Sequence, residues 1–557
     1  MRFFKFLPIA YCIILRQVVP SKKMDILRHF QNISWCKPDW CYPSMSKETN
    51  ELLRQCIDLP ALKLTDDVEE IIRKSKAFPI PFPIETVRLE KLKVRKPIDK
   101  LKRNIVSTYP VIHERVLLLM THFLIYKREF GSNIEKSLYK DMTVPDLIER
   151  ILKKRAVTFM NQNDSYLLFT GEQDEEGWEQ VGTIHQKPPL VLENCLSYDE
   201  MKLSSMVYIS GYTECINDGE RQNCGVIRED VAEEDAVIIG LIGPRFERRG
   251  KMDYEDIVIT EQQNCLEHGY GEEVTPTTCL NVLKTTYVRN NQSAKHMWRQ
   301  MWSEFYQVHS YTYEELSSYI NIQDKEEERR YMERYIKRPG TDDIFDNEVY
   351  YKRISILAES TLLEAEHRAK EAGKNAFVNV IGCGLGVWKI SPHQPDVYIL
   401  TFLERIRSFL RKDLLNHVTD VNFAFIKTSP GITALFTNPT EQSDSPVEKR
   451  IFFESKRHPK GGINVQVEDR SPSAKLFGEH AGKLLILTYP WDSNAHPGNE
   501  FWLGSLSGSG DPAAACSTQV SELHNAHINP AVSAYNVRVA GRSGLRTLSD
   551  YCLALTA

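Results

Sequence analysis

Cysteine is scarce in this sequence, with 12 among 557 residues at irregular spacing. A small disulfide-stabilised scaffold is therefore excluded, and the scatter is typical of a reducing compartment. Cys36 and Cys41 form a C-x4-C pair with Cys56 beyond it, but no second pair follows at matching spacing. We therefore interpret these three residues as ordinary thiols rather than as a structural zinc site, and we expect no metal.

The chain also lacks an excess of positive charge. It has 70 Lys and Arg against 75 Asp and Glu, a formal net charge of −5, and a pI near 6.3. Binding to the phosphate backbone of a nucleic acid depends on such an excess, so we expect no nucleic-acid partner. Any anionic ligand must be held by local groups.

Long apolar runs are missing near the N-terminus. The run at residues 6–15 contains Pro8 and is too short to span a bilayer. Arg2 and Lys5 precede it, as in a secretory signal, but no small-x-small cleavage site follows before Pro20. We interpret residues 1–23 as a leader or a dubious extension before Met24. We expect a cytoplasmic protein without a membrane span, with secretion as the alternative.

The remaining composition is that of a soluble globular protein, with 42% hydrophobic and 26% charged residues. Its pattern divides the chain into regions. Residues 24–155 are predicted to be mostly helical, with a buried helix at 111–130, and residues 156–340 to be mixed α+β. The latter region has strands at 206–210 and 236–242 and ends in a charged helix at 311–338. We expect an α/β domain at 341–530 and a poorly structured tail at 531–557.

Residues 341–530 alternate between helical and strand patterns. We expect helices at 346–372, at 401–416 and from about 513, and buried strands at 376–381, 421–427, 463–467 and 483–489. Such alternation is typical of a three-layer α/β domain, so the predicted fold class is α/β. Ligands bind beyond the carboxyl ends of the strands in such sheets, which directs attention to the loops there.

Glycine recurs at every second residue in the loop after the strand at 376–381. The loop contains Gly382, Gly384, Leu385, Gly386, Val387 and Trp388. Glycines let the backbone approach a ligand closely and turn its amide groups inward, which suits a phosphate or a diphosphate. The loop is not a P-loop, because no Gly-Lys-Ser/Thr follows, and a simple tight turn is the alternative.

Acidic and aromatic residues crowd the loop after the strand at 483–489. Residues 490–502 include two tryptophans together with Asp492, Asn494, Gly498, Asn499 and Glu500. This density favours a site over a plain surface loop. Asp511 follows directly before Pro512, so we expect Asp511 to be the N-cap of the next helix, a role compatible with ligand binding.

Together these loops resemble the macrodomain family, an α/β fold that binds ADP-ribose, and most closely the branch that removes ADP-ribose from arginine. In macrodomains a glycine-rich loop ending in an aromatic residue wraps the diphosphate, and residues 382–388 are similar to it, with Trp388 beside the distal ribose. Asn494, Gly498 and Asn499 resemble the loop at the distal ribose. Asp469, on the segment 464–469, would accept a hydrogen bond from the adenine amino group.

The order of these segments departs from the common macrodomain pattern. Here the diphosphate loop precedes the adenine and catalytic segments, so the resemblance implies a circularly permuted domain. It covers residues 341–530, and the preceding residues resemble no family of known activity.

The resemblance implies a hydrolase that acts on ADP-ribosylated arginine. Asp492, Glu500 and Asp511 would surround the bond between the distal ribose and the guanidinium group, whose positive charge explains an acidic cluster. One carboxylate would hold the guanidinium and another would orient or deprotonate water. The implied partner is ADP-ribose or an ADP-ribosylated protein, no cofactor is expected, and the oligomeric state stays open.

Three alternatives remain at this point. The chain could be a non-catalytic ADP-ribose reader, or it could hydrolyse another linkage of ADP-ribose. It could also be a helical interaction protein in which the residues before 341 carry the function.

Overall fold

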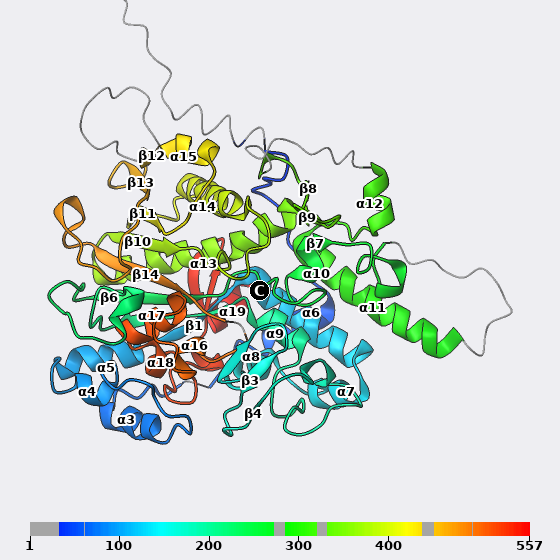
Figure 1. Cartoon of the computed structure of the whole chain (residues 1–557), viewed down its shortest axis with the longest axis horizontal. Coiled ribbons are helices and arrows are strands. Elements are labelled where there is room, and N and C mark those ends of the chain that lie inside the picture. Colours follow the sequence, from blue (N-terminus) through cyan, green and yellow to red (C-terminus); the bar gives the residue numbers. More distant parts are fainter. Residues whose placement is uncertain are drawn as a thin grey trace, which may run out of the picture.

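The computed structural model describes Phe30 and residues 33–60, 62–271, 285–319, 331–436, 450–492 and 494–556. Within these ranges the chain forms a ten-stranded sheet flanked by helices, and Figure 1 shows its first six strands, β12 to β6, one below another on one side of the molecule. The leader expected at residues 1–23 lies outside the described residues.

The strands of the large sheet come from distant parts of the chain. In order across the sheet they are β12 (Arg450–Glu454), β13 (Gly462–Val467), β11 (Val418–Ala424), β10 (Ala376–Ile381), β14 (Leu484–Pro490), β6 (Ala236–Leu241), β5 (Val207–Thr213), β1 (Tyr109–His113), β15 (Arg538–Gly541) and β16 (Gly544–Thr547). Two smaller sheets in the described residues consist of β2 (Thr158–Met160), β3 (Ser165–Leu167) and β4 (Gln173–Asp174), and of β7 (Val258–Ile259), β9 (Ile344–Asp346) and β8 (Tyr335–Lys337).

Five neighbouring strands, β13, β11, β10, β14 and β6, run parallel to one another. Neighbouring strands are paired so that their ends are nearly level: Asn379 of β10 pairs with Asn422 of β11 and with Leu487 of β14. Strand β5 is antiparallel to both β6 and β1, and β15 pairs parallel with β1. The carboxyl ends of the five parallel strands therefore meet at one edge of the sheet.

The helices lie between and around these strands. Their bounds are α2 (Lys47–Arg54), α3 (Val68–Lys76), α4 (Leu89–Leu92), α5 (Ile98–Val106), α6 (Glu114–Phe130), α7 (Asn133–Tyr139), α8 (Val144–Lys153), α9 (Tyr198–Ser204), α10 (Tyr254–Ile257), α11 (Thr285–Tyr306), α12 (Tyr313–Tyr319), α13 (Asn347–Ala372), α14 (Gln394–Arg411), α15 (Pro430–Phe436), α16 (Asn499–Trp502), α17 (Gly510–Ser517), α18 (Val520–Leu523) and α19 (Leu548–Thr556).

The long helix α13 packs against strands from both halves of the sheet, including β11, β10, β6 and β15. At its start, the Asp346 carboxylate accepts hydrogen bonds from two backbone N–H groups of the first turn. At its end, Gly373 has a φ of 61°, a left-handed conformation that glycine adopts easily because it has no Cβ. Most of its length is buried, so even its charged side chains need partners: Arg368 Nε donates to Glu364 Oε1 at 2.6 Å.

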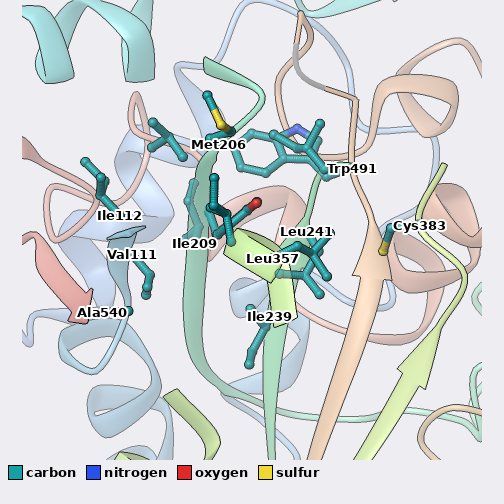
Figure 2. Packing of buried hydrophobic residues seen from close by; sticks show 14 of the residues in the cluster. Val111, Ile112, Met206, Ile209, Ile239, Leu241, Leu357, Cys383, Trp491 and Ala540 are labelled. Carbon is teal, nitrogen blue, oxygen red and sulfur yellow. The ribbon is translucent and has the colours of Figure 1, made fainter. Parts of the chain in front are cut away.

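The hydrophobic core joins the N-terminal half, the middle and the C-terminal end of the chain. Figure 2 shows Ile209 of β5, Leu241 of β6 and Leu357 of α13 together with Trp491 and Ala540. The ten-stranded sheet thus crosses the region boundaries that we expected at 340 and 530. A poorly structured tail at 531–557 is wrong, because β15, β16 and α19 form there.

The fold class, α/β, is confirmed, and most elements expected in residues 341–530 are present. The prediction of a helix over the whole of 111–130 is wrong at its start, because β1 ends at His113 and α6 begins only after it. The prediction of one charged helix over 311–338 is also wrong, since α12 ends at Tyr319 and β8 occupies Tyr335–Lys337. Residues 320–330 are outside the described residues. In the first case the strand is paired by β5 and β15, partners that periodicity does not reveal.

No helix in the described ranges is both long and apolar enough to cross a membrane.

The packing of residues 531–557 against the core leads to a prediction about stability. Val539 of β15 is fully buried, so Val539→Ala should lower the free energy of unfolding by about 2 kcal/mol through lost apolar burial and the cavity left behind. Denaturant unfolding measures the difference. Leu553→Ala on α19, where the side chain is 54% exposed, is the control and should change stability by less than about 0.5 kcal/mol. Equal stability of Val539→Ala and the wild type would contradict the packed tail.

Candidate functional site

A cavity of about 1010 Å³ lies at the carboxyl ends of the five parallel strands. Its lining includes residues at the end of each strand or within six residues after it: Ile381 and Gly382 at β10, Ala424 and Phe425 at β11, Ser471 and Pro472 after β13, Pro490 and Asp492 at β14, and Arg245 and Glu247 after β6. Both loops that the sequence analysis selected therefore open into one cavity.

The glycine-rich loop follows β10, the central one of the five parallel strands, and forms part of the cavity wall. All six residues predicted there line it: Gly382, Gly384, Leu385, Gly386, Val387 and Trp388. Gly384 has a φ of 75°, and a Cβ on it would lie 2.9 Å from the carbonyl oxygen of Pro244. A Cβ on Gly386 would meet nothing within 4 Å. Glycine is thus required at 384 for contact with the loop after β6, and at 386 the backbone is open.

Three predicted acids, Asp492, Glu500 and Asp511, also line the cavity. Asp492 follows β14, Glu500 lies on the short helix α16, and Asp511 lies in the first turn of α17. The expectation that Asp511 is an N-cap is wrong. Ser509 caps α17, with its hydroxyl accepting from the Asp511 N–H at 3.3 Å, and this leaves the Asp511 carboxylate available for other contacts.

Asp511 is buried, with 3% of its surface exposed. Its Oδ1 accepts a hydrogen bond from the Gly498 N–H at 3.2 Å, whereas its buried Oδ2 has no partner among the described residues. Burial raises the pKa of Asp511 well above its ordinary value, and the charges of Asp492 and Glu500 raise it further. The surroundings of Asp511 therefore favour its protonated form.

Asp492 is held by the neighbouring Asn499. The Asn499 amide donates to Asp492 Oδ2, and its Oδ1 accepts from the Phe159 N–H at 2.8 Å. Burial raises the pKa of Asp492 to about 6, against the opposing effect of the Arg245 charge. Asp492 therefore changes its charge just below neutral pH.

Glu500 is fixed from the other side of the cluster. Its Oε2 accepts a hydrogen bond from the Ser509 N–H at 3.0 Å. A Cβ on Gly508 would lie 2.8 Å from that same oxygen, so the glycine lets the chain pass close to the carboxylate.

Four other predicted residues do not line the cavity. Asn494 is buried, and its carbonyl oxygen accepts from the Ala156 N–H at 3.1 Å; Gly498 and Asn499 support Asp511 and Asp492 from behind. Asp469 is exposed and accepts from the Phe425 N–H at 2.6 Å, at a residue that does line the cavity. These residues therefore contact parts of the chain next to the cavity and are not part of its lining.

The sequence analysis missed several residues that line this cavity. Arg245 and Glu247 follow β6, a strand that was expected, in the segment Gly243-Pro244-Arg245. Inspection of the loop after every predicted strand would have found them. The strand at 236–242 was assigned to the mixed region 156–340, outside the α/β domain in which the loops were considered. Phe159 on β2 could not be found this way, because its position depends on the Asn499 contact.

No group of three or more His, Cys, Asp or Glu residues in the described part of the chain could hold a metal ion. The ten cysteines that the structure describes are free thiols.

A family model described as ADP-ribosylhydrolase MavL-like matches residues 69–554. The chain belongs to the MavL-like ADP-ribosylhydrolase family. Two similar proteins of Drosophila melanogaster bear the name ADP-ribosylarginine hydrolase. CG3568 is 38% identical over 511 residues, which cover 91% of this chain and 92% of that protein. CG2909 is 36% identical over 491 residues, which cover 87% and 89% respectively.

Membership of the MavL-like ADP-ribosylhydrolase family confirms the expectation of an ADP-ribosylhydrolase. The match also takes in strands β1, β5 and β6, which precede residue 341, and β15, which follows 530. The family therefore shares a larger unit than the segment 341–530.

The buried carboxyl of Asp511 should be a source of instability at neutral pH. Its raised pKa means that its contribution to stability is present at low pH and is lost as the pH rises from the unfolded pKa of about 4 through the folded pKa. Asp511→Asn keeps the Oδ1 acceptor and removes the titration. It should be as stable as the wild type near pH 4 and more stable at pH 8, by about 1.4 kcal/mol for each pH unit by which the pKa is raised.

Thermal unfolding of both proteins from pH 4 to pH 8 measures this difference. A wild type that is more stable than Asp511→Asn at pH 8 would contradict the raised pKa.

Proposed function

We propose that this chain hydrolyses the bond between ADP-ribose and the guanidinium group of a modified arginine side chain. The observation that carries the proposal is the convergence of three carboxylates and a glycine-rich loop in the lining of one cavity. The names of the two Drosophila relatives support the arginine linkage. A cationic guanidinium suits an acidic pocket, as the linkage to serine or glutamate would not.

The arrangement of the cavity supports a macrodomain-like mode of binding. The diphosphate would lie along residues 382–388 and near the first turn of α17, where backbone N–H groups and the helix dipole favour negative charge. The distal ribose would lie toward Trp388 and the acids, and the adenine toward Phe425. Because the loop after β10 precedes the loop after β14, the proposed domain is circularly permuted relative to the usual macrodomain order.

In this proposal Asp469 positions Phe425 and does not itself accept a hydrogen bond from the adenine amino group. Its carboxylate accepts from the Phe425 N–H, at a residue whose φ of 59° is unusual for a side chain other than glycine. We expect Asp469 to hold the backbone in this conformation, so that the Phe425 ring lines the adenine end of the cavity.

The environments of the three acids differ and suggest different roles. Asp492, with a pKa near 6, is suited to accept a proton from water at neutral pH. Glu500 would pair with the guanidinium group. Asp511, when protonated, would donate a hydrogen bond to a ribose oxygen from Oδ2, which has no partner among the described residues. Asn499 would keep Asp492 in position.

The proposed reaction balances without any further reactant. The water oxygen bonds to the anomeric carbon of the distal ribose, and the electron pair of the carbon–nitrogen bond goes to the guanidine nitrogen. The water proton passes to Asp492 and then to the leaving guanidine, which departs as guanidinium. Negative charge on Asp492 and Glu500 stabilises the oxocarbenium character that develops at the anomeric carbon.

Removing the carboxylate of either Asp492 or Glu500 should abolish turnover and keep binding. Asp492→Asn and Glu500→Gln should each lower the rate of ADP-ribose release from an ADP-ribosylarginine protein by at least about 100-fold, because a general base or the guanidinium partner is lost. Release from the labelled protein and calorimetry with ADP-ribose measure the two properties.

Glu220→Gln, at an exposed acid that also lines the cavity, is the matched control and should retain wild-type turnover. Wild-type turnover by Asp492→Asn would refute the role of Asp492. Binding of ADP-ribose by the wild type without hydrolysis of an arginine, serine or glutamate linkage would select a non-catalytic reader instead.

The rate should also depend on pH through Asp492. Because only the ionised carboxylate accepts a proton, kcat should fall about tenfold per pH unit below a midpoint near pH 6. The charge of Glu247 raises the pKa of Asp492, so Glu247→Gln should move this midpoint to lower pH. Single-turnover rates from pH 5 to pH 8 test both statements, and a rate constant that does not change across this range would rule out Asp492 as the base.

A further inference from the structure

Arg245 is a buried cation in an otherwise acidic part of the cavity. It is 4% exposed. Among the described residues, two basic side chains line the cavity, and the other, Arg221, is exposed. Arg245 thus differs from a surface arginine, because it has been removed from water and must be compensated from within the site.

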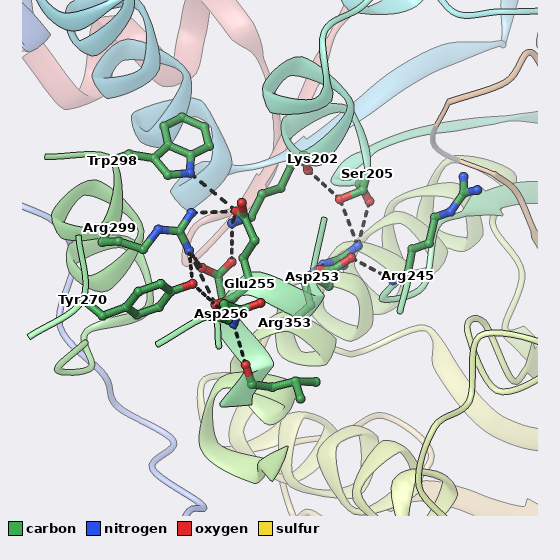
Figure 3. A network of polar contacts seen from close by, with 12 residues as sticks. Lys202, Ser205, Arg245, Asp253, Glu255, Asp256, Tyr270, Trp298, Arg299 and Arg353 are labelled. Atoms are coloured by element: carbon green, nitrogen blue, oxygen red, sulfur yellow. Dashed lines mark hydrogen bonds and ion pairs between the residues drawn. The ribbon is translucent and has the colours of Figure 1, made fainter. Parts of the chain in front are cut away.

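The backbone of Arg245 is anchored on the side away from the cavity. Its N–H donates to Asp253 Oδ2 at 2.9 Å, and Asp253 Oδ1 accepts from Arg353 Nε at 2.9 Å. Arg353, fully buried, also donates to the carbonyl oxygen of Ile242 at the end of β6. Figure 3 shows this network and the guanidinium of Arg245 pointing away from it. The position of the residue is therefore fixed independently of its side chain.

The guanidinium group itself is only partly paired. Nη2 donates to Glu247 Oε2 at 2.6 Å, whereas the buried Nη1 has no partner among the described residues. The guanidinium carbon lies 5.3 Å from the centre of the Trp388 ring and 5.1 Å from that of Phe159. Trp388 ends the glycine-rich loop, so the unpaired donor lies beside the loop proposed to hold the diphosphate.

We infer that Arg245 Nη1 donates a hydrogen bond to an oxygen of the phosphate that carries the distal ribose. The inference rests on the proposed function, and it supplies the diphosphate site with a charged donor in addition to backbone amides. The diphosphate is the anionic part of ADP-ribose, and an unpaired guanidinium N–H is a donor that fits phosphate oxygen. The positive charge also lies in the same cavity as Asp492 and Glu500, and it offsets their repulsion of a bound phosphate.

Calorimetry with ADP-ribose tests the assignment. Arg245→Met should weaken binding by roughly 10- to 100-fold, the usual loss when a charged hydrogen bond is removed. The loss should be smaller at high salt, where phosphate contacts contribute less. Arg245→Lys should recover part of the affinity, because lysine keeps the charge and loses the planar fork. Arg249→Met, an exposed arginine of the same loop, is the matched control and should bind like the wild type.

Arg245→Met leaves the Glu247 carboxylate without its partner, so the double variant Arg245→Met/Glu247→Leu provides a folded alternative, checked by thermal unfolding. It should show the same loss of affinity. Wild-type affinity in either folded variant, even with a shifted pH profile, would overturn the inference and leave the proposed function intact. A wild type that does not bind ADP-ribose at all would overturn both.

Discussion

The parallel pairing of β13, β11, β10, β14 and β6 is the constraint on which the rest of the structure depends. Strands that share a direction end at the same edge, so the loops that follow them open into a common space. The cavity is built from these loops, which lie far apart in the sequence: Arg245 and Asp492 are separated by nearly half the chain. A change of register in any of these strands would move its loop and disperse the site.

Electrostatics shape the site at a second level. Backbone amides of a glycine-rich loop and a helix N-terminus lie in the same cavity as three carboxylates, and a buried arginine lies beside both groups. Burial and the charges of neighbouring acids raise the pKa values of both Asp492 and Asp511. The environments of these two acids thus favour the protonated form more than water does, which suits a reaction that uses carboxyl groups in different protonation states.

Much of the local structure could be predicted from the sequence. The strand at 376–381 has the expected bounds, and both loops that follow predicted strands line the cavity. A parallel strand that is buried on both faces is a nearly continuous apolar run, which is easy to recognise in the sequence. The N-cap of α17 was predicted two residues too late, because Ser509 and Asp511 are both good caps and only the backbone geometry decides between them.

The sequence by itself determined the fold class, the glycine-rich loop and the acidic loop, since these follow from local periodicity and residue chemistry. Only the tertiary structure decided which of the named side chains face the cavity. Asn499 contacts Asp492 and Phe159 instead, and Asp469 holds Phe425. Arg245 comes from the loop after β6, a strand that ends 135 residues before β10 begins. The physical reason is that sheet pairing and burial act between residues distant in the chain, and no local pattern encodes them.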